Sequence, residues 1–208
     1  MKLKSMNRTN LAYTIMVAVS MLLTSIFFVS CTEDTYTPKP NAFFRIDMPE
    51  KNFSLYESDF CPLTFQFPSY TEVNQKTSYF NESPEHPCWL NLHSPYFNST
   101  LHLTYIEINS PKKLEESIND SYKYAMKHSS KADFIDETLL QPNGNTGKIF
   151  DIGGNVASSV QFYITDSTAH FLRGSLYFHE PPNVDSLRPV IDFLREDMKV
   201  LMNTTLWK

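Results

Sequence analysis

Glycine is scarce in this sequence, and so are the compositional signs of repetitive or disordered chains. Only 5 of the 208 residues are glycine, against 13 prolines, and 14% are aromatic. This mixture excludes collagen-like, coiled-coil and low-complexity arrays and favours a β-rich globular body with aromatic packing. With 41% hydrophobic and 20% charged residues, the composition also argues against disorder over most of the chain.

Basic residues are fewer than acidic ones, and they are unevenly distributed along the chain. The formal net charge is −5. Residues 1–30 contain three basic side chains and no acidic one, so the remaining 178 residues have 15 basic and 23 acidic side chains, a balance of −8. Nucleic-acid binding requires a basic surface that neutralises phosphates. We therefore expect no nucleic-acid partner.

The motifs of common catalytic and nucleotide-binding sites are also lacking. Ser158 and Ser159 lie within an expected strand, outside any G-x-S-x-G turn. Gly153 and Gly154 are followed neither by the third glycine of a dinucleotide-binding loop nor by the lysine of a P-loop. These two glycines predict a turn. We expect no enzymatic activity and no cofactor.

The N-terminus has the pattern of an export signal. A basic, polar stretch over 1–10 precedes 19 uncharged and mostly apolar residues, 11–29, which is typical of a signal peptide or a short membrane anchor. Ser30 and Cys31 end this run as a bacterial lipobox does, although Phe28 stands where lipoboxes usually have leucine. We expect residues 1–30 to be a lipoprotein signal peptide and Cys31 to be acylated after cleavage.

The segment after Cys31 separates the expected lipid from the rest of the chain. Residues 32–41 are polar, contain two prolines and show no apolar periodicity. We expect residues 31–41 to form a flexible tether and residues 42–208 to form a single globular domain. Two or more acyl chains would hold such a protein stably on a membrane. The expected location is the cell envelope, on the inner or the outer membrane, facing the periplasm.

Cys61 and Cys88 remain once Cys31 is assigned to lipid. An exported protein can form disulfides, and a bridge between these two cysteines would join positions 27 apart. A metal site made of His86, Cys88 and His93 is the alternative, but its spacing matches no standard zinc pattern. We expect the disulfide and no metal ion.

Alternation of polar and apolar residues predicts several strands. The expected strands are 63–67, 88–92, 100–108, 134–140, 148–152, 156–164 and 169–178. Between the first two, residues 68–87 predict a long loop. A helix is expected from Pro111, with Ser110 as its N-cap, and a C-terminal helix is expected with Asp185 as its N-cap.

Strands joined by short turns imply an antiparallel β-meander, and the two helices are expected to cover its sheet. The predicted fold class is therefore α+β. In its order of strands and helices, this layout resembles the sandwich of PsbP-like proteins.

Aromatic residues gather around Trp89 and again over 162–178. Core packing is the usual reason for such clusters, because alternation turns about half of them inward. Stacking of exposed rings on sugars is the alternative. An envelope glycan-binding lipoprotein is therefore the alternative function.

Several phrases of the sequence together resemble one family. They are Cys31 in its lipobox-like setting, Arg45-Ile-Asp-Met-Pro49, Cys61-Pro62, Pro87-Cys-Trp-Leu-Asn-Leu92, Gln161-Phe-Tyr-Ile-Thr-Asp-Ser167, His170-Phe-Leu-Arg-Gly-Ser-Leu-Tyr-Phe178 and Leu206-Trp-Lys208. This set resembles the GldD family of gliding motility lipoproteins of Bacteroidetes. The similarity covers essentially all of the expected exported chain.

The resemblance implies a lipid-anchored accessory protein of the gliding motility and type IX secretion machinery. Such a protein would act through contacts with other envelope proteins, without catalysis. Cys31 is the one residue to which a defined chemical role transfers, and the match at Cys61 and Cys88 is consistent with a family disulfide. The candidate partner surface consists of four residues within the matching phrases: Trp89, His170, Arg173 and Tyr177.

Overall fold

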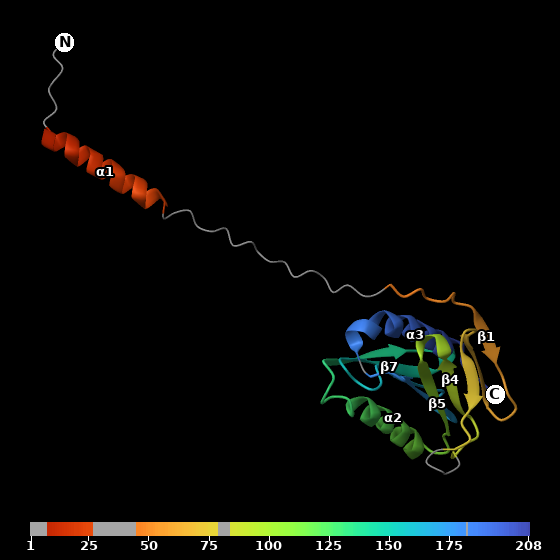
Figure 1. Cartoon of the computed structure of the whole chain (residues 1–208). Helices are drawn as coiled ribbons and strands as arrows, with labels where there is room; N and C mark the ends of the chain where they lie inside the picture. The colour runs from red at the N-terminus through yellow and green to blue at the C-terminus, as the bar shows by residue number, and fades with distance from the viewer. Residues whose placement is uncertain (1–7, 27–44, 79–83, 182) are drawn as a thin grey trace. The chain divides into compact units, whose positions relative to one another are not determined.

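The structure is a computed structural model that describes residues 8–26, 45–78, 84–181 and 183–208. The chain divides into two compact units, Met1–Ala42 and Phe43–Lys208. The described part of the first unit is helix α1 (Arg8–Ile26) (Figure 1). Cys31 and the expected tether lie outside the described residues.

The described part of the second unit contains two antiparallel sheets. The large sheet has seven strands in the order β3-β4-β5-β9-β8-β7-β6, and the small sheet has the order β1-β2-β10. The strands of the large sheet are β3 (Glu72–Gln75), β4 (Trp89–Ser94), β5 (Ser99–Glu107), β6 (Phe134–Leu140), β7 (Thr146–Gly153), β8 (Val160–Thr165) and β9 (His170–Phe178). Those of the small sheet are β1 (Phe53–Tyr56), β2 (Leu63–Pro68) and β10 (Leu206–Trp207).

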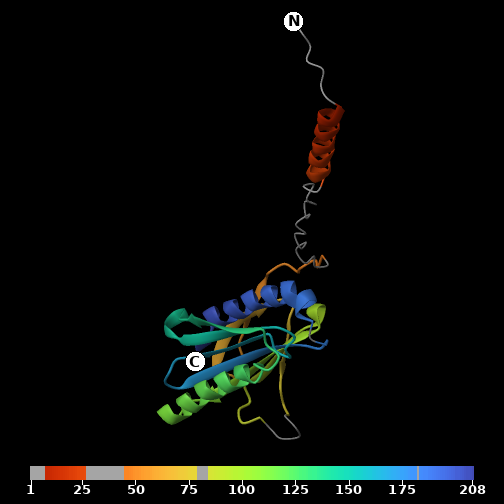
Figure 2. The ribbon, with the colours of Figure 1, turned by 90° about the vertical axis from the view of Figure 1, so that its left-hand side faces the viewer.

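Helices α2 (Pro111–Met126) and α3 (Val184–Thr204) lie on opposite faces of the large sheet (Figures 1 and 2). Two short 3₁₀ turns, η1 (Pro95–Phe97) and η2 (Pro142–Gly144), complete the unit. The main core joins the large sheet, the small sheet and α3, and a second, smaller core lies beneath α2. The predicted α+β class, with an antiparallel sheet covered by two helices, is confirmed.

The two helices differ in how well their starts were predicted. The hydroxyl of Ser110 accepts a hydrogen bond from the backbone N–H of Lys113 at 3.2 Å, so the expected cap of α2 is confirmed. The cap of α3 is Asn183, whose side chain accepts from the N–H of Ser186 at 3.4 Å. The prediction of Asp185 as the cap was wrong, because the helix begins at Val184, one residue earlier.

The sequence-based strand prediction missed or misplaced four elements. Strands β1, β3 and β10 were not expected, and β3 lies in the segment predicted to be a loop. The strand expected from residue 156 begins only at Val160. Gly154 has a positive φ of 98° and begins a turn, and the chain becomes extended again only at Val160. Ser158 and Ser159 therefore lie in the loop before β8.

Candidate functional site

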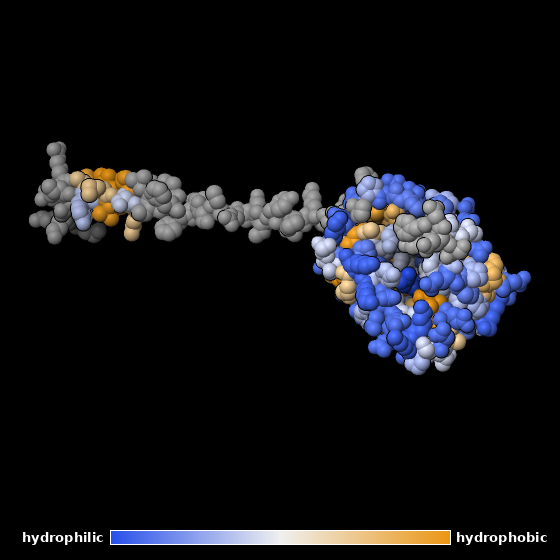
Figure 3. Space-filling model, turned by 90° about the horizontal axis from the view of Figure 1, so that it is seen from below, coloured by the Kyte–Doolittle hydropathy of each residue, from blue (hydrophilic) through white to orange (hydrophobic). Residues whose placement is uncertain are grey.

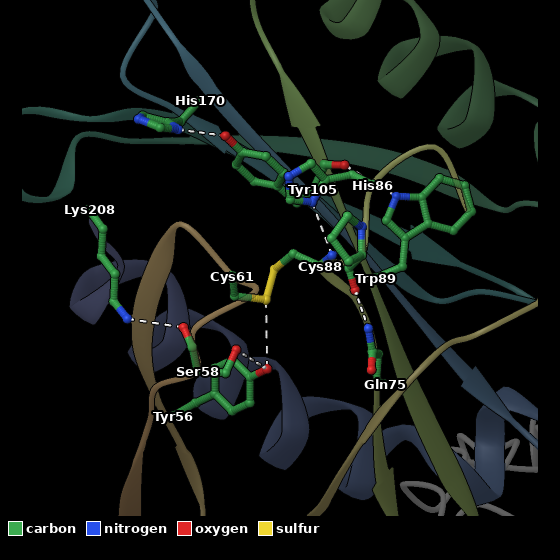
Figure 4. The surroundings of a disulfide bond; sticks show 11 residues. Tyr56, Ser58, Cys61, Gln75, His86, Cys88, Trp89, Tyr105, His170 and Lys208 are labelled. Atoms are coloured by element: carbon green, nitrogen blue, oxygen red, sulfur yellow. Dashed lines mark hydrogen bonds between the residues drawn. A yellow bond between two sulfur atoms is a disulfide. The ribbon is translucent and has the colours of Figure 1, made fainter. Parts of the chain in front are cut away.

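Cys61 and Cys88 form a disulfide bond (Figure 4). Cys61 precedes β2 of the small sheet, and Cys88 directly precedes β4 of the large sheet. Both residues are at most 1% exposed, and their Cα atoms are 4.8 Å apart. The bond therefore joins the two sheets and holds the start of β4, where Trp89 begins the strand.

Aromatic and imidazole rings surround this bond. His86 accepts the backbone N–H of Cys88 at its Nδ1 atom, at 3.0 Å, and its ring lies 4.6 Å from that of Tyr105. Burial, reinforced by the carboxylates of Glu107 and Asp166, raises the pKa of Tyr105 to about 12. Burial lowers the pKa of His86, although the charge of Glu107 opposes this shift. Both rings are therefore neutral at physiological pH.

A metal centre finds no support around the disulfide. Cys88 has no thiolate to offer, because its sulfur is bonded to that of Cys61. Within the parts of the chain that the structure describes, no three histidine, cysteine or carboxylate side chains lie close enough to hold a metal ion.

Three of the four candidate surface residues come together, and the fourth does not. Trp89 of β4 and Arg173 of β9 are both paired with Thr104 of β5, so their side chains point to the same face of the sheet. Tyr177 lies four residues after Arg173 on β9 and points to that face as well. His170 lies on the opposite side. Its ring stacks on Trp207 at 5.2 Å, and its Nδ1 atom lies 2.7 Å from the hydroxyl of Tyr105.

The three residues line an open groove of about 570 Å³ on the α2 side of the large sheet, which we call the α2-side groove. Strands β4, β5, β8 and β9 supply its floor, Lys76 directly after β3 lies at its edge, and the C-terminal end of α2 supplies one wall. Its lining residues are Lys76, Trp89, Asn91, His102, Leu103, Thr104, Tyr124, Lys127, His128, Gln161, Arg173, Ser175 and Tyr177. Figure 3 views the second unit from the side on which α2 lies in Figure 1, and most of the surface seen there is hydrophilic.

The α2-side groove is basic although the protein is acidic. Among its described lining residues are two lysines and one arginine, and none is a carboxylate. The Nζ atom of Lys127 and the Cζ atom of Arg173 lie over the ring of Tyr124, at 4.6 and 4.2 Å from its centroid. Two cations of the groove are thus held by the same tyrosine at the end of α2.

Histidine and amide side chains add neutral polar groups. The Nδ1 atom of His102 lies 2.6 Å from Oδ1 of Asn91, so that Nδ1 carries the proton and donates. Burial, with the nearby charges of Lys76 and His179, lowers the pKa of His102. The imidazole is therefore neutral at pH 7, and its second nitrogen is an acceptor.

Sequence reasoning did not single out Gln161, Tyr124 or Lys127 as functional candidates. Gln161 is 3% exposed and is one of two polar side chains in β8, a strand that is buried at every position. A polar residue in a fully buried strand is the signal that could have identified it. Lys127 carries no such signal, because only the packing of α2 brings it to the sheet.

A family model described as gliding motility lipoprotein GldD matches residues 33–207. The chain belongs to the GldD family. The match begins two residues after Cys31 and includes Cys61, Cys88 and the α2-side groove. Membership of this family associates the protein with gliding motility, and a family of lipoproteins implies a membrane-anchored location in the cell envelope.

Two further comparisons complement the family match. The solution structure of cyanobacterial PsbP (CyanoP) from Synechocystis sp. PCC 6803 is similar to this GldD-family chain with a TM-score of 0.49 and 11% identity, over 79% of this chain and 98% of that one. At this identity the likeness concerns the fold alone. A search of curated proteins gave no match. Among the helices of the described residues, none is long and apolar enough to cross a membrane.

Proposed function

We propose that this protein is a lipid-anchored accessory of the gliding motility and type IX secretion machinery, and that it acts by binding other envelope proteins. The family match over residues 33–207 carries this proposal. Residues 1–30 serve as the signal peptide, Cys31 carries the lipid, and residues 31–41 tether a domain that faces the periplasm. The protein has no catalytic role.

Surface features of the second unit support a role in protein contacts. On the small sheet, Leu55 and Leu206 pair with Gln66 and Thr64 of β2, so both leucines lie on the same face. They are 63% and 55% exposed. Exposed apolar side chains on a rigid sheet are suited to burial against a partner.

Acylation is the first step to test. Cells that express the wild-type chain are labelled with an alkyne-bearing fatty acid, and we expect the label on the protein and the protein in the membrane fraction. Cys31→Ala is expected to abolish the label. Ser30→Ala keeps a small residue before the cysteine, so it is the matched control and is expected to retain the label. An unlabelled, soluble wild-type protein would contradict the proposal.

Partner binding is tested separately, with photo-crosslinking amino acids at exposed positions. Leu206 on the small sheet, Leu139 on β6 and Lys112 on α2 sample three sides of the domain. We expect at least one position to form an adduct with an envelope protein of the gliding or secretion apparatus, identified by mass spectrometry. Labelled, membrane-bound protein without an adduct at any exposed position would exclude the interaction role while leaving the lipid anchor intact.

A further inference from the structure

We propose that the α2-side groove is a binding site for a short saccharide that carries a carboxylate. This inference goes beyond the proposed function and does not depend on it, because it concerns a small-molecule site in the folded domain. Three observations support it. They are the charge of the groove, the side chain of Gln161, which makes no hydrogen bond with another described residue, and the strands of the floor, whose backbone groups are already paired within the sheet.

The charge of the α2-side groove differs from that of the rest of the molecule. In a chain with 23 acidic and 18 basic residues, the described lining holds cations and no carboxylate. Within the described residues, neither Lys127 nor Arg173 has a carboxylate partner, and both cations contact the ring of Tyr124. Cations held together in this way repel one another and attract an anion, and arginine binds a carboxylate through two parallel hydrogen bonds.

A second hollow of the same domain provides the contrast. This hollow has a volume of about 340 Å³ and lies between the start of α3 and strands β6 and β7. Its lining includes four aspartates, Asp133, Asp136, Asp151 and Asp192, with two arginines. Arg195 there forms an ion pair with Asp151 at 2.7 Å. An aspartate thus pairs with Arg195 in that hollow, whereas Lys127 and Arg173 of the α2-side groove have no carboxylate partner among the described residues.

Gln161 is the second observation. It is 97% buried yet lines the groove, and its amide makes no hydrogen bond with another described residue. Its amide atoms are not among the fully buried, unpartnered polar atoms of the described residues, so they are accessible from the groove. An amide both donates and accepts, as does the hydroxyl of a sugar. The Gln161 amide is therefore positioned to bind a hydroxyl at the floor of the groove.

Other neutral groups extend this pattern. The hydrogen bond between His102 and Asn91 leaves the amide NH₂ of Asn91 as a donor and the second nitrogen of His102 as an acceptor. The hydroxyls of Thr104 and Ser175 line the same floor. The groove thus combines cations with several uncharged donors and acceptors, which matches a ligand that has one acidic group and many hydroxyls.

The sheet itself argues against a peptide ligand. Peptides commonly bind to sheets by adding a strand at an open edge. Strands β4, β5, β8 and β9, which form the floor of the groove, each have a paired neighbour on both sides, so their backbone groups are already bonded. Only side chains remain for recognition. The volume of about 570 Å³ also fits a small ligand of a few sugar units.

The test is calorimetric titration of the full-length protein in detergent micelles. The carboxylated probes are a hyaluronan tetrasaccharide, trigalacturonate and muramyl dipeptide, and the neutral control is chitotetraose. We expect at least one carboxylated probe to bind at least 10-fold more tightly than chitotetraose. The double variant Lys127→Gln with Arg173→Gln is expected to weaken that binding at least 10-fold.

Two further variants distinguish a loss of saccharide binding from a loss of folding. Lys112→Gln removes a cation from the exposed N-terminal end of the same helix, where the side chain is 85% exposed, and is expected to leave binding unchanged. Gln161→Leu removes the buried amide and keeps a side chain of similar size, so we expect weaker saccharide binding with an unchanged or higher thermal midpoint.

Several outcomes would overturn the inference. They are no binding of any carboxylated saccharide at millimolar concentration, equal binding of chitotetraose, and equal weakening by Lys112→Gln and by the groove variants. Tighter binding of a hexaglutamate peptide than of every saccharide would instead assign the groove to acidic peptides. None of these outcomes bears on the acylation or crosslinking results, so failure here is distinguishable from failure of the proposed function.

Discussion

The α3 side and the α2 side of the large sheet differ in what covers them. On the α3 side, the small sheet and α3 bury leucine side chains of β4, β5 and β9 together with Phe162 of β8, and the disulfide joins the two sheets. On the α2 side, the helix covers one part of the sheet, and the remaining part is the polar, basic groove. The α3 side of the sheet therefore provides stability, and the α2 side has exposed polar side chains that are available for recognition.

Each helix is bound to the rest of the domain through a tyrosine, a lysine and a carboxylate, but the surroundings of the two sets differ. On α3, Asp197 is 6% exposed, accepts from the Nζ atom of Lys51 at 2.9 Å and accepts from the hydroxyl of Tyr70. On α2, the hydroxyl of Tyr122 meets the Nζ atom of Lys148, which also binds Glu137 at 2.6 Å.

The carboxylates of these two attachments differ in exposure. Asp197 is buried, whereas the side chain of Glu137 is 34% exposed. Since water screens exposed charges, we expect the α3 attachment to contribute more to folding stability than the α2 attachment.

Removal of the disulfide should have the largest effect on the α3 side. The bond closes a loop of 27 positions, and replacing both Cys61 and Cys88 by alanine should lower the free energy of unfolding by about 3–4 kcal/mol. Chemical denaturation followed by circular dichroism measures the change. A reducing agent should destabilise the wild type and leave the double variant unaffected. A loss below about 1 kcal/mol would mean that the core alone holds the two sheets together.

Two neighbouring residues of β9 give a sharper comparison of the faces. Gly174 faces the α3 side, where an added Cβ atom would lie 2.1 Å from Cε1 of Phe162, a ring that is 1% exposed. Because this ring has little room to move, Gly174→Ala should destabilise the fold by about 1–3 kcal/mol. Thermal and chemical unfolding measure this loss.

Arg173→Gln is the matched control for Gly174→Ala, one residue away and on the opposite face. Its side chain lies over Tyr124 in the groove, and its removal should change stability by less than about 0.5 kcal/mol. If the arginine variant proved as unstable as the alanine variant, the α2 side would be structural as well, and the contrast between the faces would disappear.

The elements that could be predicted from the sequence are those whose signals are local. Helix α2 has its cap, its first-turn proline and its apolar stripe within one segment, and strands β6 to β9 follow one another through short turns. The small sheet could not be predicted in this way. Strand β10 has two residues and pairs with β2, which lies some 140 positions earlier in the chain, so no periodicity marks it.

The α2-side groove was predictable only in part. Trp89, Arg173 and Tyr177 were predicted as surface residues, and the structure brings these three together. His170 differs from Arg173 by three positions, so strand alternation alone already places it on the other face. Lys127 could not be placed from the sequence, because the crossing of α2 over the sheet decides which strands its last turn meets.

The two helix attachments are compared by an expected loss smaller than those for the disulfide and for Gly174→Ala. Tyr70→Phe removes the hydroxyl that binds the buried carboxylate of Asp197, and we expect a loss of about 1–2 kcal/mol at pH 7. Burial, followed by the hydrogen bond and the charge of Asp197, raises the pKa of Tyr70 above its ordinary value of about 10. Denaturation of both proteins across a pH series measures the difference in stability.

The sign of the pH dependence follows from that shift. A group whose pKa is higher in the folded state contributes its full stability below its unfolded pKa and loses it as the pH rises above that value. The advantage of the wild type over Tyr70→Phe should therefore be constant up to about pH 9 and shrink above about pH 10. Tyr122→Phe, the counterpart on α2, should cost less at pH 7, because its partners Lys148 and Glu137 lie nearer to water. Equal losses for the two variants would show that burial does not distinguish the attachments, and the α2 side would then hold its helix as firmly as the α3 side does.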